Sequence, residues 1–174
     1  GQFSITTSTL ADNTYSLTVT ATDAAGNISD ASDALSITID TTAPAKPSIT
    51  TTTSLTNDST PAIEGVAEAG STVTLFVDGV TTGVTATADG TTGAYTIAPT
   101  VALSDGDYAL TVTATDAAGN ASSASSALSI TVDITAPAAP TFTTADTTTN
   151  NTAPVISGIA EAGSTVELFN GSDS

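Results

Sequence analysis

An internal repeat constrains this chain more than any other feature of its sequence. The octapeptide TATDAAGN occupies residues 20–27 and returns unchanged at residues 113–120, so Asp23 and Asp116 lie 93 residues apart. The same separation relates residues 67–73 to 160–166, where both segments read AEAGSTV. A period of this length is that of a single domain rather than of a solenoid repeat. The chain is therefore expected to be an array of similar domains.

The phase of the repeat divides the chain into three parts. Residues 1–40 read as the second half of a repeat, residues 41–133 as one complete repeat, and residues 134–174 as the first half of a third. The two halves together would supply almost one repeat, apart from a segment matching about residues 80–92. Without a signal peptide or an initiating methionine, the sequence is expected to be an excerpt of something longer.

Short runs of alternating apolar residues stand between turn signals in the complete repeat. The clearest run, residues 72–77, places Val73, Leu75 and Val77 on one face. The predicted strands cover residues 47–50, 61–67, 72–77, 82–88, 94–98, 108–114 and 128–132, with a loop over residues 51–60. Strands at this spacing predict an all-β sandwich of about seven strands per repeat.

Two tyrosines mark the start of one strand in each copy of the repeat. Tyr15 and Tyr108 each follow an acidic turn and precede an alternating run. This placement predicts a tyrosine corner, in which the hydroxyl bonds the backbone of the preceding connection. A structural role is expected for both side chains, and not ligand binding.

The charge balance excludes several classes of function. The 174 residues carry 18 acidic side chains, one basic side chain and no histidine, giving a formal net charge of −17. Such a chain repels nucleic acids and anionic membranes, and its compact fold needs cations to relieve self-repulsion. There is no cysteine for disulfides or thiolate metal sites, and no apolar run long enough for a membrane span. No catalytic constellation is visible, so we expect no enzymatic activity.

Several motifs together resemble a known family. The segment DGDYALTVTATDAAGN at residues 105–120, then ITVDITAP at residues 130–137 and EAGSTV at residues 68–73, resemble the bacterial immunoglobulin-like repeats of giant secreted surface adhesins. The resemblance covers the whole chain and implies tandem immunoglobulin-like Greek-key β-sandwiches. It also implies an extracellular, cell-surface protein, commonly exported by type I secretion, that extends a distal binding region. Calcium at the domain junctions is a further implication.

The acidic residues are expected to gather at the joints between domains. In an immunoglobulin-like sandwich the B–C loop, here with Glu68, and the F–G loop, flanked by Asp116 and Asn120, lie where the chain enters. Asp40 enters at that end, and the E–F turn of the preceding repeat presents Asp12. Calcium, which takes about 6–8 oxygen ligands, suits this set better than octahedral magnesium, and zinc lacks its nitrogen and sulfur ligands. We therefore predict structural, interdomain Ca²⁺ at this joint.

The neighbouring joints repeat part of this arrangement. The second joint would use a linker aspartate and a B–C glutamate, with two aspartates approaching from the preceding repeat. The N-terminal repeat carries only the F–G half of a further site. In that order, the candidate ligands are Asp133, Glu161, Asp105, Asp107, Asp23 and Asn27.

Calcium at these joints would act mechanically. Without the ion, crowded carboxylates repel one another and the linker bends freely; with it, two domains are clamped and the rod extends. Pro44 and Pro47 restrict the linker further because proline fixes φ. The sequence thus predicts a calcium-stiffened stalk of a bacterial adhesin, whose partners are neighbouring repeats and whose distal ligand it does not identify.

Two other functions stay open. The half-repeats could complete one another between molecules and build an extracellular filament head to tail. Alternatively, the chain could be an accessory module of a secreted carbohydrate-active enzyme. An exposed aromatic platform would favour that second alternative, but the four Phe and three Tyr fall mostly at positions predicted to face the core.

Overall fold

The computed structural model describes residues 1–145 and 147–170. The chain separates into two compact units, Gly1–Asp133 and Ile134–Ser174. The regular elements of the described residues are all β-strands, and none of these residues forms a helix able to cross a bilayer. The prediction of an all-β protein is confirmed.

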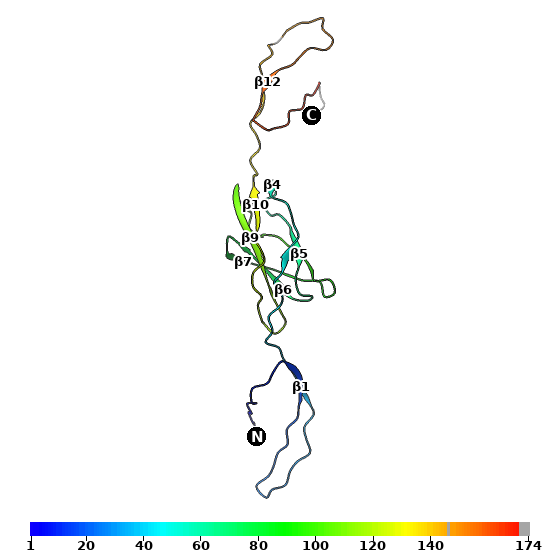
Figure 1. Cartoon of the computed structure of the whole chain (residues 1–174), viewed down its shortest axis with the longest axis vertical. Helices are drawn as coiled ribbons and strands as arrows, with labels where there is room; N and C mark the ends of the chain where they lie inside the picture. Colours follow the sequence, from blue (N-terminus) through cyan, green and yellow to red (C-terminus); the bar gives the residue numbers. More distant parts are fainter. Residues whose placement is uncertain (146, 171–174) are drawn as a thin grey trace. The chain divides into compact units, whose positions relative to one another are not determined.

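A five-stranded sheet forms one layer of a sandwich in the first unit, with strand order β4-β10-β9-β6-β7. Its strands are β4 (Leu55–Thr56), β6 (Thr72–Val77), β7 (Val80–Thr87), β9 (Gly106–Thr115) and β10 (Leu128–Val132). The long strand β9 lies between β6 and β10 and pairs antiparallel with both (Figure 1). Because a strand is pleated, successive side chains of β9 alternate between the core and the outer face.

A three-stranded sheet forms the facing layer, in the order β3-β5-β8. Its strands are β3 (Ser48–Ile49), β5 (Ile63–Val66) and β8 (Ala94–Ile97). All seven strands predicted within residues 41–133 are present, and their ends agree to within two residues. The alternation of apolar residues was therefore sufficient to locate them.

The loop predicted over residues 51–60 is wrong in one respect, because it contains β4. This short strand runs parallel to β10, where the N–H groups of Thr131 and Asp133 donate to the carbonyls of Ser54 and Thr56 at 2.8 and 2.9 Å. Two residues carry no alternation to detect, and the hydrogen-bonding partner lies about 75 residues further along the chain. Tertiary pairing alone creates this strand.

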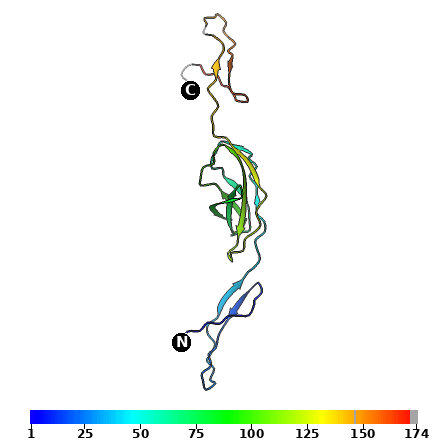
Figure 2. The same cartoon turned by 90° about the vertical axis from the view of Figure 1, so that its left-hand side faces the viewer.

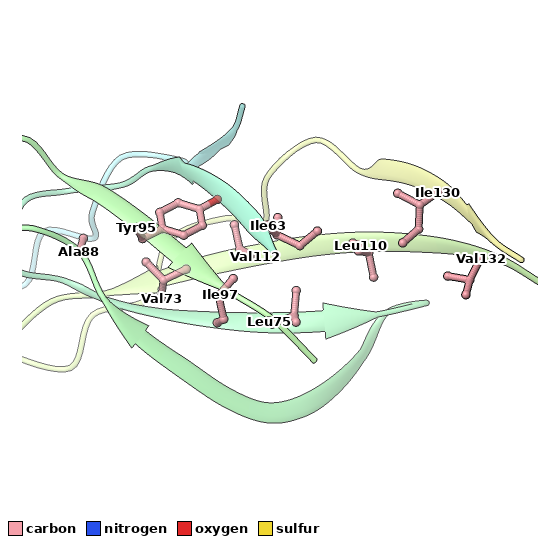
Figure 3. Packing of buried hydrophobic residues seen from close by; sticks show 10 residues of the cluster. All are labelled: Ile63, Val73, Leu75, Ala88, Tyr95, Ile97, Leu110, Val112, Ile130 and Val132. Atoms are coloured by element: carbon pink, nitrogen blue, oxygen red, sulfur yellow. The ribbon is translucent and has the colours of Figure 1, made fainter. Parts of the chain in front are cut away.

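The core lies between the two sheets. Figure 3 shows side chains from both layers pointing toward one another, among them Leu75, Leu110 and Val112 from the larger sheet and Ile63 from the smaller one. These four side chains are fully buried. The remaining buried members of the cluster are Val73, Ala88, Tyr95, Ile97, Ile130 and Val132. The core is aliphatic apart from a single tyrosine.

Tyr95 anchors the smaller sheet. Its ring is buried, its hydroxyl donates to the carbonyl of Ser48 at 2.8 Å, and burial raises its pKa to about 12. Gly65 lies opposite Tyr95 in the register of β5 and β8. A Cβ at Gly65 would collide with the Ser48 carbonyl and with the Tyr95 hydroxyl, so only glycine leaves room for this contact.

Both tyrosine corners are present. The hydroxyl of Tyr108 donates to the carbonyl of Ser104 at 3.1 Å, and the hydroxyl of Tyr15 donates to the carbonyl of Ala11 at 3.0 Å. Each bond closes the turn that leads into a strand, β9 in one case and β1 in the other. The structural role predicted for these tyrosines is confirmed.

The third sheet of the first unit is the hairpin of β1 (Asn13–Leu17) and β2 (Leu35–Ile39), drawn as two blue arrows in Figure 2. Tyr15 is paired with Ile37, just as Tyr108 is paired with Ile130 between β9 and β10. The two hairpins have the same register, shifted by the 93-residue period. The two copies of the repeat have therefore built the same local pairing from similar sequences.

The second unit contains β11 (Thr141–Phe142) and β12 (Gly158–Ile159). Phe142 pairs with Gly158 in the register in which Ile49 pairs with Gly65 between β3 and β5. The residues after β12 form a turn at 162–163 and then no regular strand up to residue 170. The described part of this unit thus repeats the pairing of two strands of the smaller sheet.

Candidate functional site

The loop after β9 is built by the side chain of Asp116. Its Oδ1 accepts the N–H groups of Ala118 and Asn120 at 2.8 and 2.9 Å, and its Oδ2 accepts the amide Nδ2 of Asn120 at 2.9 Å. The Asn120 amide is the main cause that lowers the pKa of Asp116, since these bonds favour the carboxylate form. Gly119, at φ +94°, supplies the left-handed residue that this tight loop needs.

The identical octapeptide in the first repeat builds the same loop. Asp23 Oδ1 accepts the N–H groups of Ala25 and Asn27 at 2.9 and 2.8 Å, and Oδ2 accepts the Asn27 amide at 2.8 Å. The bond from the Asn27 amide again is the main cause lowering the pKa of Asp23. The motif therefore encodes a carboxylate cradled by its own loop.

Asn120 extends this loop toward the linker. Its Nδ2 also donates to the main-chain oxygen of Asp40 at 3.0 Å, a contact between residues 80 positions apart. The structure therefore brings Asp40, Asp116 and Asn120 together, as the sequence predicts. Both bonds use the amide nitrogen of Asn120, so neither of them involves its amide oxygen Oδ1.

The linker is held from its other side by Asp12. Its Oδ1 accepts the N–H and Oγ1 of Thr41 at 3.1 and 2.7 Å, and its Oδ2 accepts Oγ1 of Thr42 at 2.8 Å. The hydroxyl of Thr41 is the main cause that lowers the pKa of Asp12. Asp40 Oδ1 accepts the N–H of Thr42 at 3.0 Å. Two carboxylates thus gather around the linker and are satisfied by its own donors.

Glu68 closes the turn after β5 through its main chain. Its carbonyl accepts the N–H and Oγ of Ser71 at 3.1 and 2.7 Å. Glu161 makes the same two bonds with Ser164, at 3.1 and 2.8 Å. These contacts position both glutamates in turns, where the sequence places them, and they leave the carboxylates out of the turn hydrogen bonding.

The chemistry of the donors at the Asp40 joint suits calcium. Carboxylates, an amide oxygen and main-chain carbonyls are the hard oxygen ligands that calcium prefers. Among the residues that the structure describes, no group of three acidic side chains lies ready to hold a metal ion. Metal binding at this joint therefore requires rotation of side chains, above all of Asn120. A half-turn of its amide would present Oδ1 where Nδ2 now faces Asp40 and Asp116.

The ligands predicted for the second joint are only partly placed. Asp107 accepts a hydrogen bond from Oγ1 of Thr131, and Asp105 lies in the turn before β9. Asp133 follows β10 at the end of the first unit, whereas Glu161 belongs to the second unit. A calcium site that joins them stays a prediction.

Sequence reasoning missed the threonines and serines around this site. Thr41 and Thr42 bind Asp12, and the segment leading from Asn120 to β10 is fastened to β9 by Ser122 and Ser125. The chain is so rich in Thr and Ser that a hydroxyl near a carboxylate is no signal. The spacing Ser122–Ser125 does recur as Ser29–Ser32, and that recurrence was the available clue.

Comparison with known proteins identifies a relative that is an enzyme by name. Exoglucanase B of Cellulomonas fimi is 36% identical over 151 residues, which cover 84% of this chain and 13% of the exoglucanase. The chain therefore spans about an eighth of the length of that relative.

Two solved structures are partly similar. The fibronectin(III)-like modules of Clostridium thermocellum CbhA match 71% of this chain and 64% of their own, with 19% identity and a TM-score of 0.45. A biofilm-associated protein, BSP domain, matches 73% of this chain and 20% of its own, with 22% identity and a TM-score of 0.41. The sequence profile of the bacterial Ig-like domain matches residues 1–41 and again residues 45–134. The chain belongs to the bacterial Ig-like domain family.

Proposed function

We propose that this chain is a structural spacer in the stalk of a bacterial surface protein, outside the cell, and that calcium stiffens its joints. The observation that carries the proposal is the hydrogen bond from Asn120, held by Asp116, to the main chain of Asp40. A loop of one domain thereby grips the linker through which the chain enters that domain. Such a grip transmits the orientation of one domain to the next, which is what a spacer requires.

The proposal includes tandem repeats, with residues 41–133 as a complete one and residues 1–40 and 134–174 as parts of its neighbours. The shared register of β1–β2 and β9–β10 supports this division, as does that of β11–β12 and β3–β5. The partners of each repeat are therefore other repeats of the same kind. The family match, which occurs twice along the chain, agrees with this arrangement.

The residues at the Asp40 joint would hold calcium through Asp40, Glu68, Asp116 and Asn120. Bound calcium would supply positive charge where several carboxylates meet. The side chains then fix the linker against the loop, and the proline residues beyond it limit the remaining freedom. With the ion removed, only hydrogen bonds such as that from Asn120 to Asp40 hold the linker, and repulsion between carboxylates works against them, while the complete sandwich keeps its core and stays folded.

Small-angle scattering of the full chain, at a dilution where it is monomeric, tests this function. We expect the radius of gyration to rise with calcium and to fall with chelator, because the clamped linker extends the chain. The double variant D116A/N120A should lose this response. Circular dichroism should stay unchanged on chelation, since the ion acts at the joint.

The variant D58A is the matched control. Asp58 also builds its own loop, accepting the N–H and Oγ1 of Thr60 at 2.8 and 3.3 Å. It follows β4, which pairs beside the start of β9, whereas Asp116 follows the end of β9. D58A should keep the full response to calcium. An unchanged radius of gyration in the unmodified chain, together with no calcium uptake in calorimetry, contradicts the proposal.

A second candidate is an accessory module of a secreted carbohydrate-active enzyme. The 36% identity to exoglucanase B is the observation that favours it. Reading the coding sequence on both sides of this segment separates the two candidates. Further repeats support the spacer, and a glycosidase domain supports the accessory module.

A further inference from the structure

The strands β4 and β10 form a parallel pair, whereas every other strand pair in the described part of the chain is antiparallel. The N–H groups of Thr131 and Asp133 donate to the carbonyls of Ser54 and Thr56 at 2.8 and 2.9 Å. Parallel pairing places the beginnings of both strands at the same end of the pair. The pair therefore responds to stretching of the chain differently from a hairpin.

The same pair joins the entry of the complete repeat to its exit. The chain enters through β3, passes into β4 after a short connection, and leaves directly after β10. Figure 1 shows β4 beside β10, at the end of the sandwich where β10 leads out. Tension along the chain thus pulls β4 from its beginning and β10 from its end. Because the strands are parallel, the two pulls are opposed along the strand axis, and the hydrogen bonds of the pair share the load.

Both strands of the pair are anchored in the body of the domain. Ile130 and Val132 of β10 are 3% and 1% exposed, so β10 cannot slide without opening the core. Beyond β4, the carbonyl of Ser59 accepts the N–H of Leu103 at 2.8 Å, and Leu103 packs against the core. Sliding of β4 past β10 therefore breaks main-chain hydrogen bonds and disturbs buried side chains together.

The strand β3 carries the load before β4 does. Its Ser48 carbonyl accepts the hydroxyl of Tyr95 at 2.8 Å, and the N–H of Thr50 donates to the carbonyl of Glu64 at 2.8 Å. Release of β3 frees only the segment that leads to β4, and the β4–β10 pair stays closed. The β4–β10 pair is thus the barrier that tension meets after β3.

We propose that the β4–β10 pair is a mechanical clamp, by which the complete repeat resists tension along the stalk. The inference rests on the proposed spacer function for its biological use, and it adds tensile strength to the stiffness of the joint. The clamp consists of main-chain hydrogen bonds and needs no calcium. It should act equally in calcium and in chelator.

A proline at residue 56 removes one donor from the clamp. The carbonyls of Ser54 and Thr56 face β10, and the N–H of a strand residue points to the same side as its own carbonyl. The N–H of Thr56 therefore faces β10, whereas that of Leu55 faces away from it. The substitutions T56P and L55P place the same ring in β4, but only T56P takes a hydrogen bond from the pair.

Single-molecule stretching of the full chain from its two ends, in chelator, tests the clamp. Unfolding of residues 41–133 is recognised by a gain in length on the order of 300 Å, since an extended residue spans about 3.3–3.6 Å. Forced unfolding reports the unfolding rate. We expect T56P to unfold roughly five to ten times faster than the unmodified chain at the same load, because one of the bonds that share the load is missing.

The variants L55P and T56A are the matched controls. Leu55 is 66% exposed, so L55P constrains the backbone without removing a buried side chain. T56A keeps the N–H and removes only the hydroxyl, which accepts the N–H of Asp58 at 3.0 Å. Both controls should unfold within about twofold of the rate of the unmodified chain, as exposed substitutions usually do.

The direction of pulling tests the clamp with its own residues unchanged. The chain has no cysteine, so T72C/T87C provides two handles at chosen positions. Thr72 and Thr87 are paired at the open end of the β6–β7 hairpin, and force between them opens that hairpin one bond at a time. Unfolding from these handles should be at least about tenfold faster than from the chain ends at the same load, since each bond carries the load alone.

Two results overturn the inference. One is the same unfolding rate for T56P as for L55P and T56A, and the other is the same rate in both pulling directions. If T56P does not fold, the comparison of directions decides alone. The radius of gyration measures the calcium joint separately, so a chain without the calcium response can still show the clamp, and a chain without the clamp can still show the calcium response.

Discussion

The complete repeat and the two segments beside it share one sequence pattern, but they differ in whether a second sheet covers the apolar face. Val112 and Val19 are the same residue one period apart, on hairpins of identical register, yet only Val112 is fully buried. The alternation of side chains decides which face of a hairpin is apolar. Burial requires a facing sheet, and in the complete repeat the sheet of β3, β5 and β8 covers Val112. A pattern therefore specifies a surface, and only a partner layer turns that surface into a core.

The largest difference should appear in core leucines. Leu110 is fully buried, so L110A should lower the free energy of unfolding by about 2–5 kcal/mol. Leu17, one period earlier, is half-buried, so L17A should cost about 1 kcal/mol or less. Urea denaturation of the full chain, followed by circular dichroism, measures both. Equal losses would mean that the hairpin has a core of its own.

Alkaline pH should destabilise the fold through the buried hydroxyl of Tyr95. Burial raises the pKa of Tyr95 to about 12, above its unfolded value of about 10. The neutral form is thus favoured by folding, and its contribution to stability should be present below pH about 10 and disappear as the pH rises toward about 12. Thermal unfolding across this range measures the loss. Y95F should remove this part of the pH dependence and itself cost about 1–3 kcal/mol, because the Ser48 carbonyl loses its partner.

The smallest difference in stability should appear at the serine whose hydroxyl accepts a backbone N–H group in each copy of the repeat. Ser125 Oγ accepts the buried N–H of Val112 at 3.0 Å, and Ser32 Oγ accepts the N–H of Val19 at 3.2 Å. S125A should cost about 1–2 kcal/mol, because a buried donor loses its acceptor. S32A should cost a few tenths of a kcal/mol at most, roughly the effect of an exposed site, because water replaces the serine. Urea midpoints measure the pair, and similar losses would contradict the contrast in burial.

Much of the candidate site follows from the repeat. The repeated octapeptide predicts that the same loop occurs twice. The carboxylates of Asp23 and Asp116 accept the same three hydrogen bonds within their loops. The approach of Asp40 to that loop also follows, because the entry of the chain lies at the same end of the sandwich. The role of Asp12 does not follow, because its hydrogen bonds to Thr41 and Thr42 depend on how the turn before β1 meets the linker.

The sequence by itself determined where the alternating strands lie and how the loop around each repeated aspartate is built. These are local outcomes, because alternation, tight turns and side-chain caps act over a few residues. Only the tertiary structure decided that Leu55–Thr56 is a strand, that Gly65 makes room for Tyr95, and that Asn120 grips the main chain of Asp40. Each of these contacts joins residues distant along the chain. The groups in contact come together only when the sheets pack, so no local sequence pattern predicts these contacts.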